Sequence, residues 1–175
     1  DPEFAYLTGK HMEHYLNDVS IAQKYAHLNR KAMISEIVKY MGWHIEREFD
    51  TIHNYADTEA KILRKGAISA KAGEEVLIPI NMRDGSILAT CKGNADWNQS
   101  APHGAGRLFS RTQAKKTFEM EDYIETMKGV YTTSVSPSTL DEAPFAYKTM
   151  EEILERTADT FEVKAILKPL YNFKA

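Results

Sequence analysis

The chain has 175 residues, of which 43% are hydrophobic and 27% are charged, and its formal net charge is −3. This composition is typical of a globular protein, and the absence of a long apolar run excludes a membrane-spanning segment. A chain with this charge does not attract polyanions as a whole, so binding to nucleic acid requires a local basic patch. The single cysteine, Cys91, excludes internal disulfides and favours a reducing, cytoplasmic location.

Two features of the N-terminus indicate a piece of a longer protein. The first four residues, DPEF, are typical of a remnant of an expression vector, so residues 1–4 are left out of the fold prediction. No initiator methionine is present, and the sequence that follows begins abruptly at Ala5.

The first predicted element is a long helix over residues 12–41. Its apolar residues recur at spacings of three, four or seven and form one stripe, which is the pattern of an amphipathic helix. No proline interrupts this pattern, and Gly42 is the expected stop.

Strands and turns are predicted after the helix. Residues 45–55 alternate and are rich in β-prone types, so they predict a strand or a strand-like turn. Residues 94–106 are polar and rich in Gly, Pro and Asn, which predicts a loop. Between these two segments the predicted strands are 60–68, 75–80 and 86–91.

The C-terminal part mixes short helices with strands. The predicted helices are 107–116, 119–128 and 149–160, and the predicted strands are 130–135 and 163–168. The whole pattern predicts an α+β fold, with a long N-terminal helix, mixed or antiparallel strands and short helices.

One short segment, SAPHGAGRLFSR, combines a single histidine with a glycine-rich turn. Pro102 restricts the backbone before His103, and Gly104 and Gly106 allow backbone amides to approach a ligand closely. A helix start near Arg107 would favour an anion. A neutral imidazole beside a bound phosphate can act as a nucleophile and form a phosphorus–nitrogen bond. The alternative is a loop histidine that only packs against its neighbours.

Three basic residues follow this histidine. Arg107, Arg111 and Lys115 lie four residues apart, so a helix would place them on one face. Two interpretations remain open: a solvated cationic face, or a track for the backbone of RNA or DNA.

Two further residues have both a structural and a functional interpretation. His53 follows a strand-like segment, but a metal ion needs several ligands and none lies nearby in the sequence. Lys174 is the penultimate residue, and terminal lysines are usually solvated. The preceding segment, ILKPLYNF, is apolar enough to dock the C-terminus against the rest of the protein.

The segment KGNADWNQSAPHGAGRLFSRTQAKK closely resembles the guanylyl-transfer loop of the RtcB family of tRNA-splicing and RNA-repair ligases. The resemblance covers nearly the whole chain, from Ala5 to Ala175. YLNDVSIAQKYAHLNRKAMI is similar to the long helix of the family, IHNYA to its metal-binding His-Asn step, and LRKGA and LIPINM to the strands that follow. DEAPFAYK and the terminal lysine resemble its C-terminus. One departure is Ile80-Asn81, where many members have small residues, often Gly-Ser.

The resemblance implies a ligase that uses GTP and manganese. His103 would attack the α-phosphate of GTP, release pyrophosphate and become guanylylated. The guanylate would pass to an RNA 3′-phosphate formed from a 2′,3′-cyclic phosphate, and a 5′-hydroxyl would then displace GMP and join the strands. The expected partners are GTP and RNA, such as tRNA halves or broken RNA. Whether an activating protein is also needed stays open.

The same resemblance implies roles for individual residues. His53 would be a manganese ligand, Asn54 would lie close to the phosphates, and Tyr147 and Lys174 would contact the base. Arg107 is our own candidate for a contact with RNA or pyrophosphate. The nucleotide pocket would be lined by Pro79, Ile80, Asn81, Met82 and Ser86, and the guanylate would be surrounded by Gly104, Ala105 and Gly106.

Members of this family are considerably longer, and their N-terminal half carries further metal ligands. The resemblance therefore implies that residues 5–175 are the C-terminal, guanylate-binding half, and that the missing half is a partner. Apolar surface exposed by the missing half would favour self-association. Two alternatives are a non-catalytic module that binds a nucleotide or RNA, and a histidine phosphotransfer or phosphohydrolase domain.

Overall fold

The computed structural model describes residues 5–172, so residues 1–4 and Lys174 lie outside the described part. The chain divides into two compact units. The N-terminal unit comprises the residues up to Asp50 together with those from Asn54 to Lys65. The C-terminal unit comprises Thr51–His53 and the residues from Gly66 onward.

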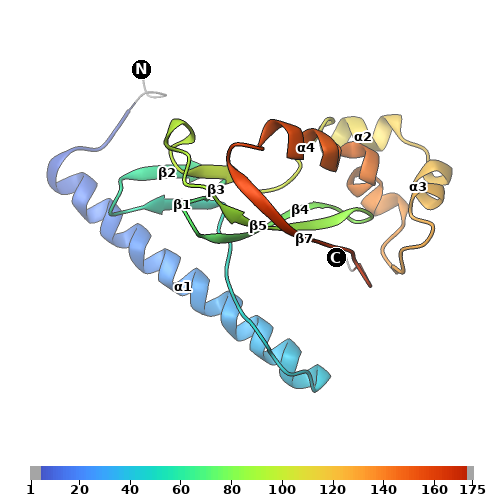
Figure 1. Ribbon diagram of the computed structural model, residues 1–175, viewed down its shortest axis with the longest axis horizontal. Coiled ribbons are helices and arrows are strands. Elements are labelled where there is room, and N and C mark those ends of the chain that lie inside the picture. The colour runs from blue at the N-terminus through green and yellow to red at the C-terminus, as the bar shows by residue number, and fades with distance from the viewer. Residues whose placement is uncertain (1–4, 173–175) are drawn as a thin grey trace. The chain divides into compact units, whose positions relative to one another are not determined.

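The N-terminal unit consists of one long helix and a two-stranded hairpin (Figure 1). Helix α1 (Gly9–Met41) confirms the predicted helix and ends at Gly42, which adopts the left-handed conformation with φ +65°. Strands β1 (Asn54–Asp57) and β2 (Ile62–Lys65) pair antiparallel. The Gln23 side chain joins the helix to the hairpin, since it accepts from Ala56 N at 2.7 Å and donates to Ala56 O at 3.1 Å.

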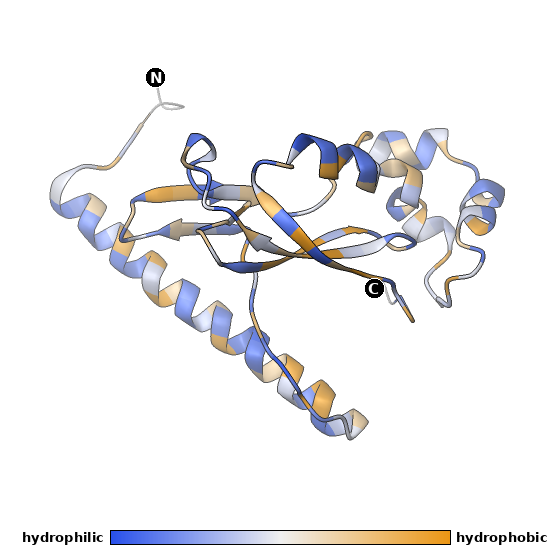
Figure 2. Ribbon diagram, in the orientation of Figure 1, coloured by the Kyte–Doolittle hydropathy of each residue, from blue (hydrophilic) through white to orange (hydrophobic). Residues whose placement is uncertain are grey.

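Helix α1 buries none of its residues. Figure 2 shows hydrophobic and hydrophilic residues interspersed along it. Large side chains such as Tyr25 and Ile21 are 71% and 62% exposed. The helix therefore offers considerable apolar surface, and self-association through it stays a prediction.

The predicted strand at residues 45–55 is wrong for its first nine residues, because regular pairing begins only at Asn54. Side chains hold this segment instead of a backbone ladder. Asp50 accepts hydrogen bonds from His27 at 3.0 Å and from Arg30 at 2.6 Å, both on α1. Burial opposes ionisation of Asp50, but these two partners outweigh it and lower the pKa of the carboxyl.

An antiparallel sheet of order β4-β5-β7 forms the centre of the C-terminal unit (Figure 1). Its strands β4 (Glu75–Asn81), β5 (Gly85–Cys91) and β7 (Phe161–Leu167) agree with three of the predicted strands. The predicted strand 60–68 is divided at Gly66, whose φ is +67°, into β2 and β3 (Ala67–Ser69).

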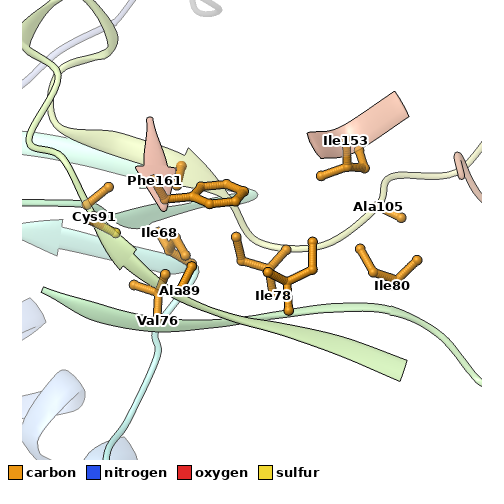
Figure 3. Packing of buried hydrophobic residues seen from close by; sticks show 12 residues of the cluster. Ile68, Val76, Ile78, Ile80, Ala89, Cys91, Ala105, Ile153 and Phe161 are labelled. Atoms are coloured by element: carbon orange, nitrogen blue, oxygen red, sulfur yellow. The ribbon is translucent and has the colours of Figure 1, made fainter. Parts of the chain in front are cut away.

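The main core packs between this sheet, the β3-β6 pair and helix α4 (Met150–Arg156). Ile78 and Ile87, which lie opposite each other on β4 and β5, are fully buried. Ile153 of α4 covers them, and Figure 3 shows Ile80 and Ala105 at the same end of the cluster as Ile153. This end of the core borders the cavity described below.

A second core lies under the short helices. Helices α2 (Arg111–Thr117) and α3 (Met120–Thr126) are shorter than predicted. Tyr123 of α3 is fully buried and contacts Met82 through its hydroxyl at 3.3 Å. The start of α2 was predicted four residues too early, because Ser110 and Gln113 form a capping box that fixes it at Arg111.

Two other predictions were wrong. Residues 130–135 form no strand, because the Thr132 hydroxyl accepts from Ser134 N at 3.0 Å and donates to Asn172 O at 2.9 Å, in place of a backbone ladder. Residues 94–106 are not all loop. They contain the 3₁₀ helix η2 (Ala95–Trp97) and strand β6 (Ser100–Pro102), which pairs with β3.

The remaining 3₁₀ helices, η3 (Pro137–Glu142) and η4 (Pro144–Ala146), lead into α4. Within the described residues, no helix combines the length and the hydropathy needed to cross a bilayer. Together, the elements of the two units confirm the predicted α+β class.

Gly85 provides a test of the sheet. Its φ is +88°, and a Cβ atom at this position would overlap the carbonyl oxygen of Leu167 on β7. We expect Gly85→Ala to lower the free energy of unfolding by roughly 2–4 kcal/mol, because two paired strands must separate. Urea denaturation followed by circular dichroism measures the loss.

Gly73→Ala is the matched control for this substitution. Gly73 has a similar φ of +79°, but a Cβ atom there would meet nothing within 4 Å. We expect Gly73→Ala to cost about 1 kcal/mol, the strain of the left-handed conformation alone. Equal losses for the two variants would contradict the steric explanation for Gly85.

Candidate functional site

A cavity of about 810 Å³ lies in the C-terminal unit. Four parts of the unit form its walls: the end of the β4-β5 hairpin, the loop that follows β6, the segment of Glu142 and Tyr147, and the segment that follows β7. The described residues that line it are Pro79, Ile80, Asn81, Met82, Gly85, Ser86, His103, Gly104, Ala105, Gly106, Arg107, Arg111, Glu142, Tyr147, Leu167, Lys168, Pro169 and Asn172.

Most of the residues singled out in the sequence lie around this cavity. They come from four separate segments that only the fold brings together. Lys115 and His53 do not line the cavity, but His53 stacks on the ring of His103, which does. Asn54 belongs to the N-terminal unit. Lys174 lies outside the described residues.

The ring of His103 is held by its backbone surroundings. Pairing of Ala67 with Pro102 brings Gly66 beside the histidine, and Nδ1 lies 2.6 Å from the Gly66 carbonyl oxygen. A carbonyl oxygen can only accept, so Nδ1 carries the proton and donates it. The lone pair is therefore on Nε2, the nitrogen that can attack an electrophile.

His53 packs against the same ring. The centroids of His53 and His103 are 4.9 Å apart, and the two planes differ by 13°. Thr51, two residues earlier, accepts a hydrogen bond from Leu77 N at 3.2 Å, which attaches this segment to the free edge of β4. The exposed imidazole of His53 thus lies next to the half-buried imidazole of His103.

The glycine-rich loop presents backbone to the cavity. A Cβ atom on Gly104 would lie 3.0 Å from the carbonyl oxygen of Pro79, so the loop packs closely against β4. Gly106 adopts the left-handed conformation with φ +72°. Because small residues occupy positions 104–106, a ligand can approach their main-chain amides.

Asn81 shapes the turn of the β4-β5 hairpin, which forms another wall. Its Oδ1 accepts from the amides of Arg83 and Asp84 at 2.9 and 2.8 Å, and its Nδ2 donates to Asp84 at 2.8 Å. The hydrogen bond from Arg83 lowers the pKa of Asp84 most strongly. The polar atoms of Asn81 are therefore engaged in the turn, whereas Ser86 lines the cavity from β5.

Arg107, Glu142 and Tyr147 form a network at another wall. Arg107 Nη1 donates to Tyr147 Oη at 2.9 Å and to Glu142 Oε1 at 3.3 Å, and its guanidinium lies 5.0 Å from the Tyr147 ring centroid. Tyr147 donates to Glu142 Oε2 at 2.7 Å. Burial, reinforced by this hydrogen bond, raises the pKa of Tyr147, so the phenol remains a donor.

The three predicted basic residues converge, but not along a helix. Arg107 precedes α2 and pairs with Tyr147 in an isolated bridge, so the predicted common helix face is wrong for Arg107, whereas Arg111 and Lys115 both lie on α2. The side chains of Arg107, Arg111 and Lys115 instead all approach the carboxylate of Asp141, at 3.7, 3.8 and 3.3 Å. The start of α2 is closed by its capping box and does not extend the glycine-rich loop.

Several residues around the cavity have no clear signal in the sequence. Glu142 could not be expected from a search for anion-binding residues, because its charge has the wrong sign. Asn172 donates to Met82 O at 2.6 Å and, with Pro169, closes the wall formed by the C-terminal segment. Lys168, directly after β7, also lines the cavity, and its signal in the sequence is a cation within an apolar segment.

The described residues do not by themselves fit a complete metal site. Within residues 5–172, no group of three or more His, Cys, Asp or Glu side chains could hold a metal ion. His53 and His103 are the two imidazoles that lie together. A metal ion at this position would need ligands from outside the described residues.

Comparison with known proteins places the chain in a family. The profile of a family described as tRNA-splicing ligase RtcB matches residues 1–175. The RNA-splicing ligase RtcB of Escherichia coli K12 is 33% identical over 182 aligned residues, which cover 94% of this chain and 44% of that protein.

Two archaeal proteins show the same relationship. The tRNA-splicing ligase RtcB of Aeropyrum pernix is 34% identical and covers 63% of this chain and 29% of its own length. The corresponding protein of Methanopyrus kandleri is 32% identical, covering 83% of this chain and 19% of its own length. The chain thus spans less than half the length of these relatives, and it belongs to the RtcB family of tRNA-splicing ligases.

Proposed function

We propose that this chain is the nucleophile-bearing and guanylate-binding part of an RNA ligase. The observation that carries the proposal is the contact between the Gly66 carbonyl and Nδ1 of His103, a residue that lines the cavity. Because Nδ1 donates to this oxygen, Nε2 of the neutral ring is the nitrogen that can attack a phosphate. The names of the relatives support ligation of RNA as the reaction.

In the first proposed step, Nε2 of His103 attacks the α-phosphorus of GTP. The Nε2–P bond forms as the bond between this phosphorus and the bridging oxygen breaks, and pyrophosphate leaves with that oxygen. The imidazole becomes cationic. Its Nδ1–H remains bonded to Gly66 O, and this charge-assisted hydrogen bond stabilises the product.

In the following steps, the guanylate passes from His103 to an RNA 3′-phosphate, which restores the neutral imidazole. That 3′-phosphate arises when water attacks a 2′,3′-cyclic phosphate and the bond between phosphorus and O2′ breaks, which leaves a 2′-hydroxyl. The 5′-hydroxyl of a second RNA end then attacks the activated phosphorus, GMP leaves, and a phosphodiester joins the strands. The arginines that line the cavity would bind the phosphates of the RNA ends.

The cavity supports a guanine-nucleotide pocket. Ser86 and the Pro79–Met82 turn would contact the base, Tyr147 would pack near it, and the backbone of Gly104–Gly106 would surround the phosphate. Asn54 and Lys174 are further proposed contacts from the rest of the chain. The polar atoms of Asn81 already serve the hairpin, so its contribution to the pocket is its backbone and its shape.

A manganese ion would require groups beyond the described residues. His53 would supply one ligand beside His103, and the N-terminal part of the longer protein would supply the others. Such an ion, when bound, polarises the phosphate under attack. The chain itself contributes the nucleophile, its orientation through Gly66 and the anion-binding wall.

We expect the isolated chain to show no labelling of His103 when it is incubated with α-³²P-labelled GTP and manganese, because its metal ligands are incomplete. Adding the N-terminal half of a family member in trans should restore labelling, and gel autoradiography measures both results. No labelling in any such mixture would favour a non-catalytic binding module, and equal labelling with ATP would favour a general phosphotransfer domain.

In the restored ligase we expect His103→Ala to abolish labelling completely, because it removes the nucleophile. His14→Ala is the control: this histidine is exposed on α1 and is not among the described residues that line the cavity, and labelling should remain at the level of the unmodified protein. Persistent labelling of His103→Ala would move the nucleophile to another residue.

A further inference from the structure

Asp141 is a buried carboxylate that lies behind the cavity wall. Only 7% of its side-chain surface is exposed, and it does not line the cavity. The two arginines beside it, Arg107 and Arg111, do line the cavity. Burying a carboxylate is costly unless cations and hydrogen bonds compensate it, so this position requires the basic side chains around it.

Three cations share this one carboxylate. Lys115 Nζ lies 3.3 Å from Oδ1, while Arg107 Nη2 and Arg111 Nε lie 3.7 and 3.8 Å from Oδ2. These distances are longer than the 2.7–2.9 Å or so of a tight charge-assisted hydrogen bond. The carboxylate therefore attracts the guanidinium groups without occupying all of their N–H donors.

The backbone contributes to the same arrangement. Arg107 Nη2 donates to the main-chain carbonyl of Asp141 in a short hydrogen bond. The neighbouring Glu142 accepts from Arg107 Nη1 at 3.3 Å and approaches Arg111 Nη2 at 4.0 Å. Three cationic side chains thus face two carboxylates, and the group keeps a net positive charge beside the cavity.

Without Asp141, the three cations would repel one another, and the side chain of Arg111, which is 77% exposed, would be free to turn away from the cavity. We propose that Asp141 is a positioning residue that holds Arg107 and Arg111 toward the cavity so that they bind a phosphate group of the RNA substrate. The inference rests on the proposed RNA ligase function and extends it to a residue that touches no substrate.

Removing the negative charge of Asp141 can change the affinity for phosphate in two ways, and the two changes have opposite signs. Asp141→Asn adds one unit of positive charge next to the arginines while it preserves the shape of the side chain. If Asp141 acted only through its charge, this variant would bind phosphate more tightly, because the carboxylate of Asp141 no longer repels the phosphate. If Asp141 positions the arginines, the variant binds phosphate more weakly, because the two-arginine arrangement is lost.

The test compares Asp141→Asn with Asp122→Asn in this chain. Asp122 is exposed on α3, and its substitution causes the same change in net charge. The probes are short RNA oligonucleotides ending in a 3′-phosphate or a 3′-hydroxyl, measured by fluorescence anisotropy, and inorganic pyrophosphate, measured by calorimetry. The difference in affinity between the two oligonucleotides measures binding of the RNA 3′-phosphate. Pyrophosphate measures binding of phosphates that derive from the nucleotide instead.

We expect Asp141→Asn to weaken binding of the 3′-phosphate RNA by roughly tenfold and to reduce its preference over the 3′-hydroxyl RNA, the loss expected when a charge-assisted contact is displaced. A purely structural role would not change this preference. Asp122→Asn should bind equally or slightly more tightly. Weakening that is confined to pyrophosphate would overturn the assignment to RNA.

Equal or tighter RNA binding by Asp141→Asn would overturn the inference and leave the proposed function intact. Failure of the unmodified chain to bind either 3′-phosphate RNA or pyrophosphate would overturn both. If Asp141→Asn does not fold, as judged by circular dichroism, Asp141→Glu takes its place. This variant keeps the charge but moves it by one methylene, and unchanged RNA binding by it would likewise contradict a positioning role.

Discussion

The hydrogen bond between His103 Nδ1 and the carbonyl of Gly66 is the interaction on which the site depends. It fixes which nitrogen of the imidazole carries the proton and therefore which one can act as a nucleophile. The bond exists because β3 pairs with β6, and this pairing brings together residues that are far apart in the chain. The left-handed conformation of Gly66 separates β2 from β3 and turns its carbonyl toward the ring.

The walls of the cavity carry two kinds of polar group among apolar side chains. Backbone and small residues form one wall, and a network of paired charges forms another. Because Arg107 is bound by Glu142, Tyr147 and Asp141, it is ordered before any ligand arrives, which lowers the entropic cost of binding. Asn172 and the segment around Thr132 attach the C-terminal tail, so that it closes the cavity on a third side.

Secondary structure could be predicted where the sequence pattern of an element matches the burial of its residues in the fold. Strands β4 and β5 alternate between buried and less buried residues, and Gly42 ends α1 as its position indicated. The strand predictions were wrong where hydrogen bonds from side chains replace the backbone pairing of a strand. Asp50 is bound by His27 and Arg30, so its segment remains irregular, and the Thr132 hydroxyl replaces a ladder in a segment of high β-propensity.

The sequence by itself determined the family, the α+β class and the residue types of the site, because the histidine, its glycines and the arginines lie within one short and specific segment. Only the tertiary structure decided the tautomer of His103, the stacking of His53 on it, and the convergence of three cations on Asp141. Each of these depends on a contact between segments distant in the chain. Local pattern carries no information about such contacts, because they are set by strand pairing and by packing of the core.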